Sequence, residues 1–156
     1  MDSAEGGLRS LVLEGHELHA SLRARPIDSI CHLPRGVVLP SNPHLSTDAK
    51  FVEAIARSGS QGTLGSEGIR SAFYALHAAG ENDLGIYGLE AKSDAEADKR
   101  ENAIREIWAY NARRDLARVH RKNLVIVVVW HATVSPECWE PVNASVVDRL
   151  NAPGTL

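Results

Sequence analysis

Residues 123–130, NLVIVVVW, carry five consecutive β-branched side chains. Such side chains favour extended backbone, so this stretch predicts a strand. Since its apolar residues do not alternate with polar ones, both faces of the strand are expected to be covered. We therefore expect a central strand in a sheet that has helices on its two sides.

Extended chain is also expected around Leu84, Ile86, Tyr87 and Leu89, where Gly85 and Gly88 permit a bend. A helix is expected over 94–121, because acidic residues at its start and basic residues at its end oppose the helix dipole. That helix would be about 40 Å long, so a break is expected near Asn111. The strand–helix–strand order predicts a right-handed crossover between parallel neighbours.

The rest of the chain predicts mostly helices. They are expected over 4–25, from Ser46 or Thr47 to about 59, and over 66–79 with Gly80 as the stop. Residues 26–47 hold four prolines and predict an irregular connector with a short strand at 37–39, and residues 134–156 predict a tail with a short helix at 142–150. The order α-α-α-β-α-β favours one α/β or α+β domain over 1–156, with a small mixed sheet flanked by helices.

Composition excludes several classes of protein. The 156 residues include 17 basic and 20 acidic ones, for a net charge of −3, so neither a strongly basic coat for nucleic acid nor a polyanionic tail is present. The longest apolar run, 124–130, is too short to cross a bilayer, and no secretory signal is seen at the N-terminus. Two cysteines make no disulfide framework, so a reduced cytoplasmic setting without membrane contact is expected.

One short motif points to chemistry. Asp83, Glu90 and Lys92 form D-x6-E-x-K, in the segments GEND (80–83) and LEAKS (89–93). With its setting between two predicted helices, and a buried strand after them, the motif resembles the PD-(D/E)xK nuclease superfamily. The resemblance covers about residues 66–130 and rests on three side chains and the order of elements.

The resemblance implies a metal-dependent nuclease that hydrolyses phosphodiester bonds. Asp83 and Glu90 would hold Mg²⁺ through hard oxygen ligands, with Glu67 as a further ligand. Lys92 would orient the attacking water and offset phosphate charge. A stable homodimer through the apolar face of residues 8–22 would fit such an enzyme.

The residues alone set a geometric condition on this site. Glu90 and Lys92 share a face of a strand, but Asp83 and Glu90, seven residues apart, lie on opposite faces unless the chain turns between them. A hairpin in 83–92 would favour the nuclease, and one straight strand would favour a non-enzymatic oligomeric module with a structural or regulatory role. In that second hypothesis Glu90 and Lys92 form a solvated pair.

Three other groups of residues each allow a functional and a purely structural interpretation. A basic series could contact nucleic acid or could complement the dipole of its own helix; it comprises Arg113, Arg114, Arg118, Arg121 and Lys122. A second set could bind zinc or consist of surface and buried side chains; it comprises His16, His19, Cys31 and His32. Cys138 and His131 could form a nucleophilic pair or pack in the core. The motifs of nucleotide-binding loops and serine hydrolases do not occur.

Overall fold

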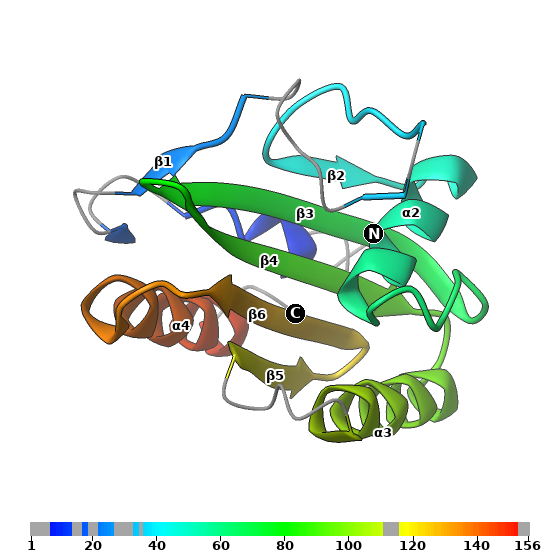
Figure 1. Ribbon diagram of the computed structural model, residues 1–156. Coiled ribbons are helices and arrows are strands. Elements are labelled where there is room, and N and C mark those ends of the chain that lie inside the picture. Colours follow the sequence, from blue (N-terminus) through cyan, green and yellow to red (C-terminus); the bar gives the residue numbers. More distant parts are fainter. Residues whose placement is uncertain are drawn as a thin grey trace.

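The computed structural model describes residues 7–13, 17–18, 22–26, 33–34, 36–110 and 116–152. It contains a six-stranded antiparallel sheet with helices packed on it, which is an α+β fold (Figure 1). The α+β expectation is therefore confirmed. All pairs between the described strands are antiparallel, so the sheet is not of the mixed kind.

The sheet has the strand order β1-β3-β4-β6-β5, and β2 also pairs with β3. The strands are β1 (Leu22–Ala24), β2 (His44–Ser46), β3 (Ile69–Ala79), β4 (Asn82–Ala91), β5 (Ala117–Lys122) and β6 (Val125–Ala132). The helices are α2 (Ala49–Gly59), α3 (Asp94–Tyr110) and α4 (Pro136–Asn151). In Figure 1, the β3–β4 hairpin crosses the middle of the molecule, and β5 lies at the lower edge of the sheet, beside α3.

The sheet separates two hydrophobic cores. Residues of α2 and α3, such as Ile55 and Ile104, share one core with the even-numbered residues of β6. The odd-numbered residues of β6 share the other core with α4 and with Leu8 and Leu11 of the N-terminal segment. Since β6 lies between β4 and β5 and is buried on both faces, the prediction of a covered central strand is confirmed.

Residues 69–79 form a strand, so the helix predicted over 66–79 is wrong. Ile69, Phe73 and Leu76 have helical spacing, but residues 71–77 are all buried because both faces of β3 are covered. A strand of this kind lacks the alternation by which strands are recognised. Gly80, at a φ of 67°, lies in the two-residue turn into β4 and does not end a helix.

The helix predicted over 94–121 ends at Tyr110, and its last part is β5. Asn123, at a φ of 54°, permits a two-residue turn that reverses the chain from β5 into β6. Because of this hairpin, β4 and β6 are antiparallel neighbours, and the expected parallel crossover is wrong. The break expected near Asn111 lies outside the described residues.

The ends of the chain also differ from the predicted element order. Residues 22–24 are strand β1, so the predicted helix over 4–25 does not extend through them. The strand expected at 37–39 is not formed, and β2 follows at His44–Ser46. Asp48, whose side chain accepts from the N–H of Lys50, is the N-cap of α2 in place of Ser46 or Thr47.

The segment after residue 134 is not a tail, because α4 covers one face of the sheet. Its residues Val142, Val146 and Leu150 are buried in the second core. The helix expected at 142–150 is therefore confirmed as part of a longer one.

The N-terminal segment packs its apolar side chains against the sheet of its own domain. Leu8 and Leu11 are fully buried, and a Cβ atom at Gly88 of β4 would lie 2.9 and 2.8 Å from their side chains. Gly88 therefore lets this segment approach the sheet closely. Since Leu22 is buried as well, these three leucines are not available for the expected dimer interface, whereas Val12 of the same predicted face is 42 % exposed.

Candidate functional site

Asp83 and Glu90 do not converge. Strand β4 runs without interruption from Asn82 to Ala91, so the two carboxylates are separated by seven residues, or about 23 Å of strand. They also lie on opposite faces of the sheet, because side chains alternate along a strand. The paired metal ligands expected from the motif are therefore not formed, since neither Gly85 nor Gly88 produces a turn.

Asp83 has a structural partner at the hairpin end of β4. Its Oδ1 is 2.8 Å from both Nε and Nη2 of Arg25, which follows β1. The Asp83 side chain is 13 % exposed. This forked ion pair ties the short strand β1 to the hairpin.

Glu90 is fully buried, although its side chain is ionisable. Its Oε1 accepts a hydrogen bond from the hydroxyl of Ser71 at 2.6 Å, and its Oε2 lies 3.3 Å from Nη1 of Arg70. Both donors come from β3, where Ser71 is the direct partner of Glu90 in the strand pair. The carboxylate is thus satisfied within the sheet, as a buried charge must be.

Lys92 and Glu67 lie at the same end of the sheet as Glu90. The N–H of Lys92 donates to the C=O of Gly68 at 2.9 Å, which brings the segment before β3 beside the end of β4. Both side chains are exposed. Glu67 is directed to a small cavity against α3 and does not join Glu90. In the part of the chain that the structure describes, no three metal-ligating side chains form a group that could hold Mg²⁺.

The basic residues of β5 are occupied by contacts within the chain. Arg121 forms ion pairs with Asp98 at 2.5 Å and Glu101 at 3.2 Å, and hydrogen bonding to Asp98 raises the pKa of Arg121. The guanidinium of Arg118 lies 4.8 Å above the ring of Trp139. The dipole interpretation required these residues to lie at the end of a helix, and it is wrong because they lie on a strand.

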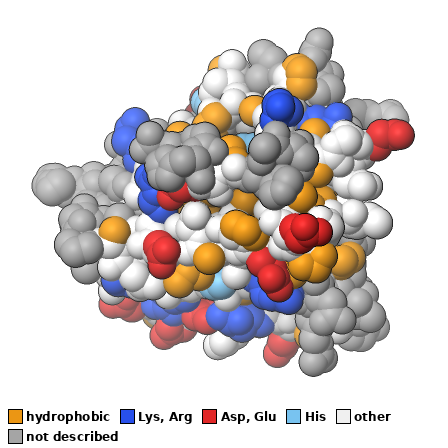
Figure 2. Space-filling view, turned by 90° about the vertical axis from the view of Figure 1, so that its left-hand side faces the viewer, with side chains coloured by type: hydrophobic (Ala, Val, Ile, Leu, Met, Phe, Trp, Pro, Cys, Tyr) orange, Lys and Arg blue, Asp and Glu red, His pale blue; other side chains and the backbone are white. Residues whose placement is uncertain are grey.

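Three further basic residues complete this series. Lys122 contacts Asn151 at 3.4 Å, and Arg113 and Arg114 lie outside the described residues. On the face seen in Figure 2, acidic and basic side chains are interspersed with hydrophobic ones. The described part of that face therefore shows no broad cationic surface for a phosphate backbone.

The other sequence candidates give no reactive site among the described residues. The expected zinc set, His16, His19, Cys31 and His32, lies outside them. Cys138 is buried and lies 3.6 Å from the hydroxyl of Ser135, while the ring of His131 stacks on Trp139 at 4.6 Å. These are contacts of packed side chains.

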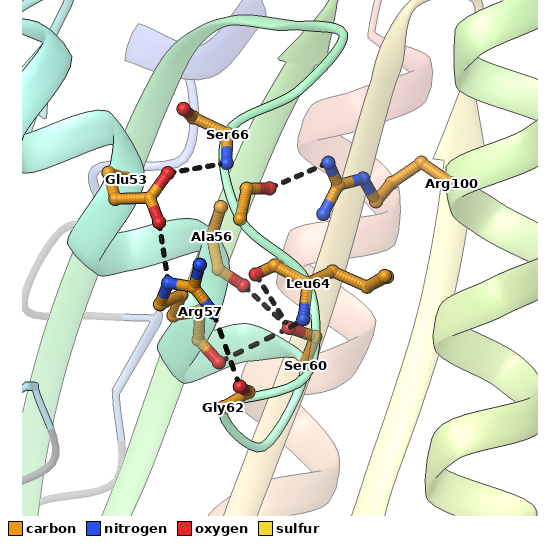
Figure 3. A network of polar contacts seen from close by, with 9 residues as sticks. Glu53, Ala56, Arg57, Ser60, Gly62, Leu64, Ser66 and Arg100 are labelled. Carbon is orange, nitrogen blue, oxygen red and sulfur yellow. Dashed lines mark hydrogen bonds and ion pairs between the residues drawn. The ribbon is translucent and has the colours of Figure 1, made fainter.

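The loop between α2 and β3 is held by a network of buried polar contacts (Figure 3). The hydroxyl of Ser60, with no exposed surface, donates to carbonyl oxygens and accepts from the N–H of Leu64 at 2.9 Å. Glu53 accepts from the N–H of Ser66 at 2.8 Å and from Arg57 at 2.5 Å. The bond from Ser66 lowers the pKa of Glu53. This network fixes the shape of residues 60–66.

Arg100 of α3 completes the network from the other side. Its Nη2 donates to the carbonyl oxygens of Gly65 and Glu67, both at 2.7 Å. Burial lowers the pKa of Arg100, and Glu96, Glu53 and Glu67 oppose that shift. The guanidinium therefore joins the loop to α3 at the cost of its own hydration.

A groove runs between α3 and the edge strand β5. It has a volume of about 400 Å³ and is lined by Arg105, Trp108 and Ala109 of α3 and by four consecutive residues, 117–120, of β5. Ligand sites in proteins typically have about 300–1,000 Å³. Arg105 contributes a guanidinium group to this lining, whereas the side chains of Arg118 and His120 contact Trp139 and Asn143 of α4 on the opposite face of the sheet.

The register shows which backbone groups of β5 face this groove. The C=O of Leu124 accepts from the N–H of Ala91 on β4. Because backbone groups alternate in direction along an antiparallel strand, the odd-numbered residues of β6 bond toward β5. Their partners are the even-numbered residues of β5. The odd-numbered ones, Ala117, Val119 and Arg121, therefore direct their N–H and C=O groups outward.

Sequence reasoning did not find this groove. It placed the basic series on a helix, whereas the alternation of ARVHRK followed by Asn123-Leu124 is the signal of a strand and a short turn. That signal was hidden by a charge pattern typical of helix ends.

His77 of β3 carries a pH-dependent contribution to stability. It is 8 % exposed, and no hydrogen bond to its Nδ1 is found among the described residues. Burial lowers the pKa of His77 below its ordinary value of 6.5. The unfolded chain therefore takes up the proton first, and protonation favours unfolding.

We expect full stability above pH 6.5 and a loss of stability as the pH falls toward the lower pKa of folded His77. Urea unfolding at about pH 7.5 and about pH 5.5 measures this loss, with His77→Leu as the comparison. The other titrating groups are common to both proteins, so the wild type should lose more. An equal loss in both proteins would contradict the expectation.

Comparison with protein-family models, with curated proteins and with solved structures finds no match to this chain. The site is therefore judged on its geometry alone. In the described residues, no helix has the length and apolar character needed to span a bilayer.

Proposed function

We propose that this protein is a non-enzymatic interaction module that binds an extended peptide segment of a partner along β5. The observation that supports this proposal is the groove in which the outward-facing edge of β5 lies opposite α3. In strand addition, main-chain hydrogen bonds supply affinity, and alternate side chains supply specificity. A groove between an edge strand and a helix offers both kinds of contact.

The lining of the groove favours an acidic peptide. Among the side chains that face the groove, Arg105 carries a positive charge. A carboxylate of the peptide would find complementary charge on this guanidinium group. The half-buried side chain of Val119 would contact an apolar residue of the same peptide.

Arg105 protects the edge while no partner is bound. Its Nη2 donates to the outward C=O of Val119 at 2.9 Å, and its Nε contacts Glu101 at 3.0 Å. Charged side chains commonly guard exposed strand edges in this way. Since the Arg105 side chain is 50 % exposed, it can turn aside into water at small cost when a peptide N–H takes its place.

The nuclease hypothesis is not supported by the arrangement of its own motif. It required Asp83 and Glu90 to meet, and straight β4 places them on opposite faces. A straight strand was the outcome expected for an interaction module. The homo-oligomer expected from the sequence stays a prediction, and Leu8, Leu11 and Leu22 are not part of its interface because they are buried.

The test is a selection of random displayed peptides on the wild-type protein, with affinities then compared against Val119→Pro. Proline removes the outward N–H but is tolerated at strand edges. We expect acidic peptides that bind the wild type and lose at least about tenfold in affinity, or 1.4 kcal/mol, in the variant. Arg105→Gln should weaken the acidic peptides less, because it removes one charge and also uncovers the edge.

The matched control is Ala24→Pro on β1, at the opposite edge of the sheet. The N–H of Arg25 donates to the C=O of Leu76 on β3, so the N–H of Ala24 faces outward. This variant should bind the selected peptides as the wild type does, with both variants folded by circular dichroism. Equal binding to wild type and Val119→Pro, or no enriched peptide, would refute the proposal.

A further inference from the structure

A small cavity lies between the first half of α3 and the loop that precedes β3. It has a volume of about 70 Å³, and Leu64, Glu67, Glu96, Lys99, Arg100 and Ala103 line it. This is the end of α3 opposite to the peptide groove. A liquid water molecule occupies about 30 Å³, so the cavity admits only a ligand of a few non-hydrogen atoms.

Arg100 presents an unused donor to this cavity. Its side chain is only 7 % exposed, and its Nη1 is buried and lacks a hydrogen-bond partner among the described residues. Figure 3 shows the other terminal nitrogen joined to the loop, while Nη1 points toward Leu64, which also lines the cavity. A buried guanidinium nitrogen without an acceptor is energetically costly, so we expect an oxygen atom of a ligand or water to accept a hydrogen bond from it.

The charges around the cavity are of both signs. Arg100 and Lys99 are cationic, and Glu67 and Glu96 are anionic. The carboxylate of Glu96 is held against the backbone, since a Cβ at Gly68 would lie 2.5 Å from its Oε1. A simple anion would meet two carboxylates, and a simple cation would meet a buried guanidinium. A small zwitterion has a partner for each end.

We propose that the cavity binds the α-amino carboxylate of a small amino acid. The ligand carboxylate would accept from Nη1 of Arg100, with Lys99 beside it. The ligand ammonium would lie between Glu67 and Glu96. The volume limits the ligand to the smallest members of the class, and binding would hold the α2–β3 loop against α3.

The test is an NMR titration of the full chain with glycine, with acetate and methylammonium as separate half-ligands at equal ionic strength. Amide signals of Leu64, Glu67 and Arg100 should shift, and glycine should bind at least about tenfold more tightly than either half-ligand. Equal binding of acetate and glycine, or no shift with glycine, would overturn the proposal and leave Nη1 to a water molecule.

Two variants of exposed glutamates provide the matched comparison. Glu67→Gln removes one carboxylate from the loop side of the cavity, and Glu106→Gln removes one from the exposed surface of α3 outside the cavity. Both should fold, because neither side chain is buried. Glycine affinity should fall severalfold in Glu67→Gln and stay unchanged in Glu106→Gln. Equal affinities in the two variants would also refute the proposal.

Discussion

Trp108→Ala is expected to lower the free energy of unfolding by about 3–5 kcal/mol, the range found when buried Trp or Phe is cut to Ala. Trp108 is 4 % exposed and belongs to the core between the sheet, α2 and α3. Its Nε1–H donates to the C=O of Gly59 at 3.2 Å, so the indole joins α3 to the end of α2. The substitution leaves a cavity in the core and removes the hydrogen-bond donor to the C=O of Gly59.

Urea unfolding followed by circular dichroism measures this change. Trp108→Phe separates the two contributions, because it keeps most of the ring and removes the N–H, and it should lose less than the alanine variant. Asn102→Ala, on the exposed side of α3, should stay within about 0.5 kcal/mol of the wild type. A loss below about 1 kcal/mol in Trp108→Ala would show that α3 does not depend on this contact.

Ser71→Ala is expected to lower the free energy of unfolding by about 2–3 kcal/mol, since hydrogen bonds to charged groups contribute about that much. The hydroxyl of Ser71 makes the 2.6 Å bond to the carboxylate of Glu90, which has no exposed surface. Arg70, 46 % exposed and 3.3 Å away, would remain as the other partner of the charge. A buried carboxylate with one distant partner is poorly compensated.

A double variant tests the cause of this loss. Glu90→Leu in the Ser71→Ala background removes the buried charge, and it should recover at least half of the lost stability. Thr63→Ala, which removes an exposed hydroxyl, serves as the control and should change little. If Ser71→Ala unfolds as the wild type does, water reaches Glu90, contrary to the burial of its carboxylate.

The elements predicted correctly share one property. Their local sequence pattern favours the same backbone conformation that tertiary packing requires. The β-branched run in β6 favours only extended backbone, and Ser93-Asp94 followed by acidic residues marks the start of α3. The helix within 142–150 is visible from its own apolar spacing. In each case the signal lies within the segment itself.

The elements predicted wrongly depend on partners far along the chain. Strand β3 has neighbours on both sides of it and cores on both faces, so its burial has no period that a single sequence reveals. Strand β5 carries a charge pattern typical of a helix end, but it pairs with β6 through a two-residue turn. Pairing across the sheet overrides these local preferences.

The candidate motif illustrates the same limit at the level of a site. The spacing of Asp83 and Glu90 already placed them on opposite faces of any straight strand. Whether the chain turns between them could not be read from Gly85 and Gly88, because glycine permits a turn without requiring one. The pairing of β4 with β3 and β6 along its whole length keeps the strand straight.

By itself, the sequence determined that this chain builds a sheet with helices packed on it around a central strand within 123–130, because a run of β-branched residues strongly favours extended backbone. Only the tertiary structure decided what the charged residues do. Glu90 is buried because Ser71 and Arg70 lie beside it on β3, and the edge of β5 faces a groove because α3 packs next to it. Those contacts join residues distant in the chain, and their free energies exist only once the sheet has formed.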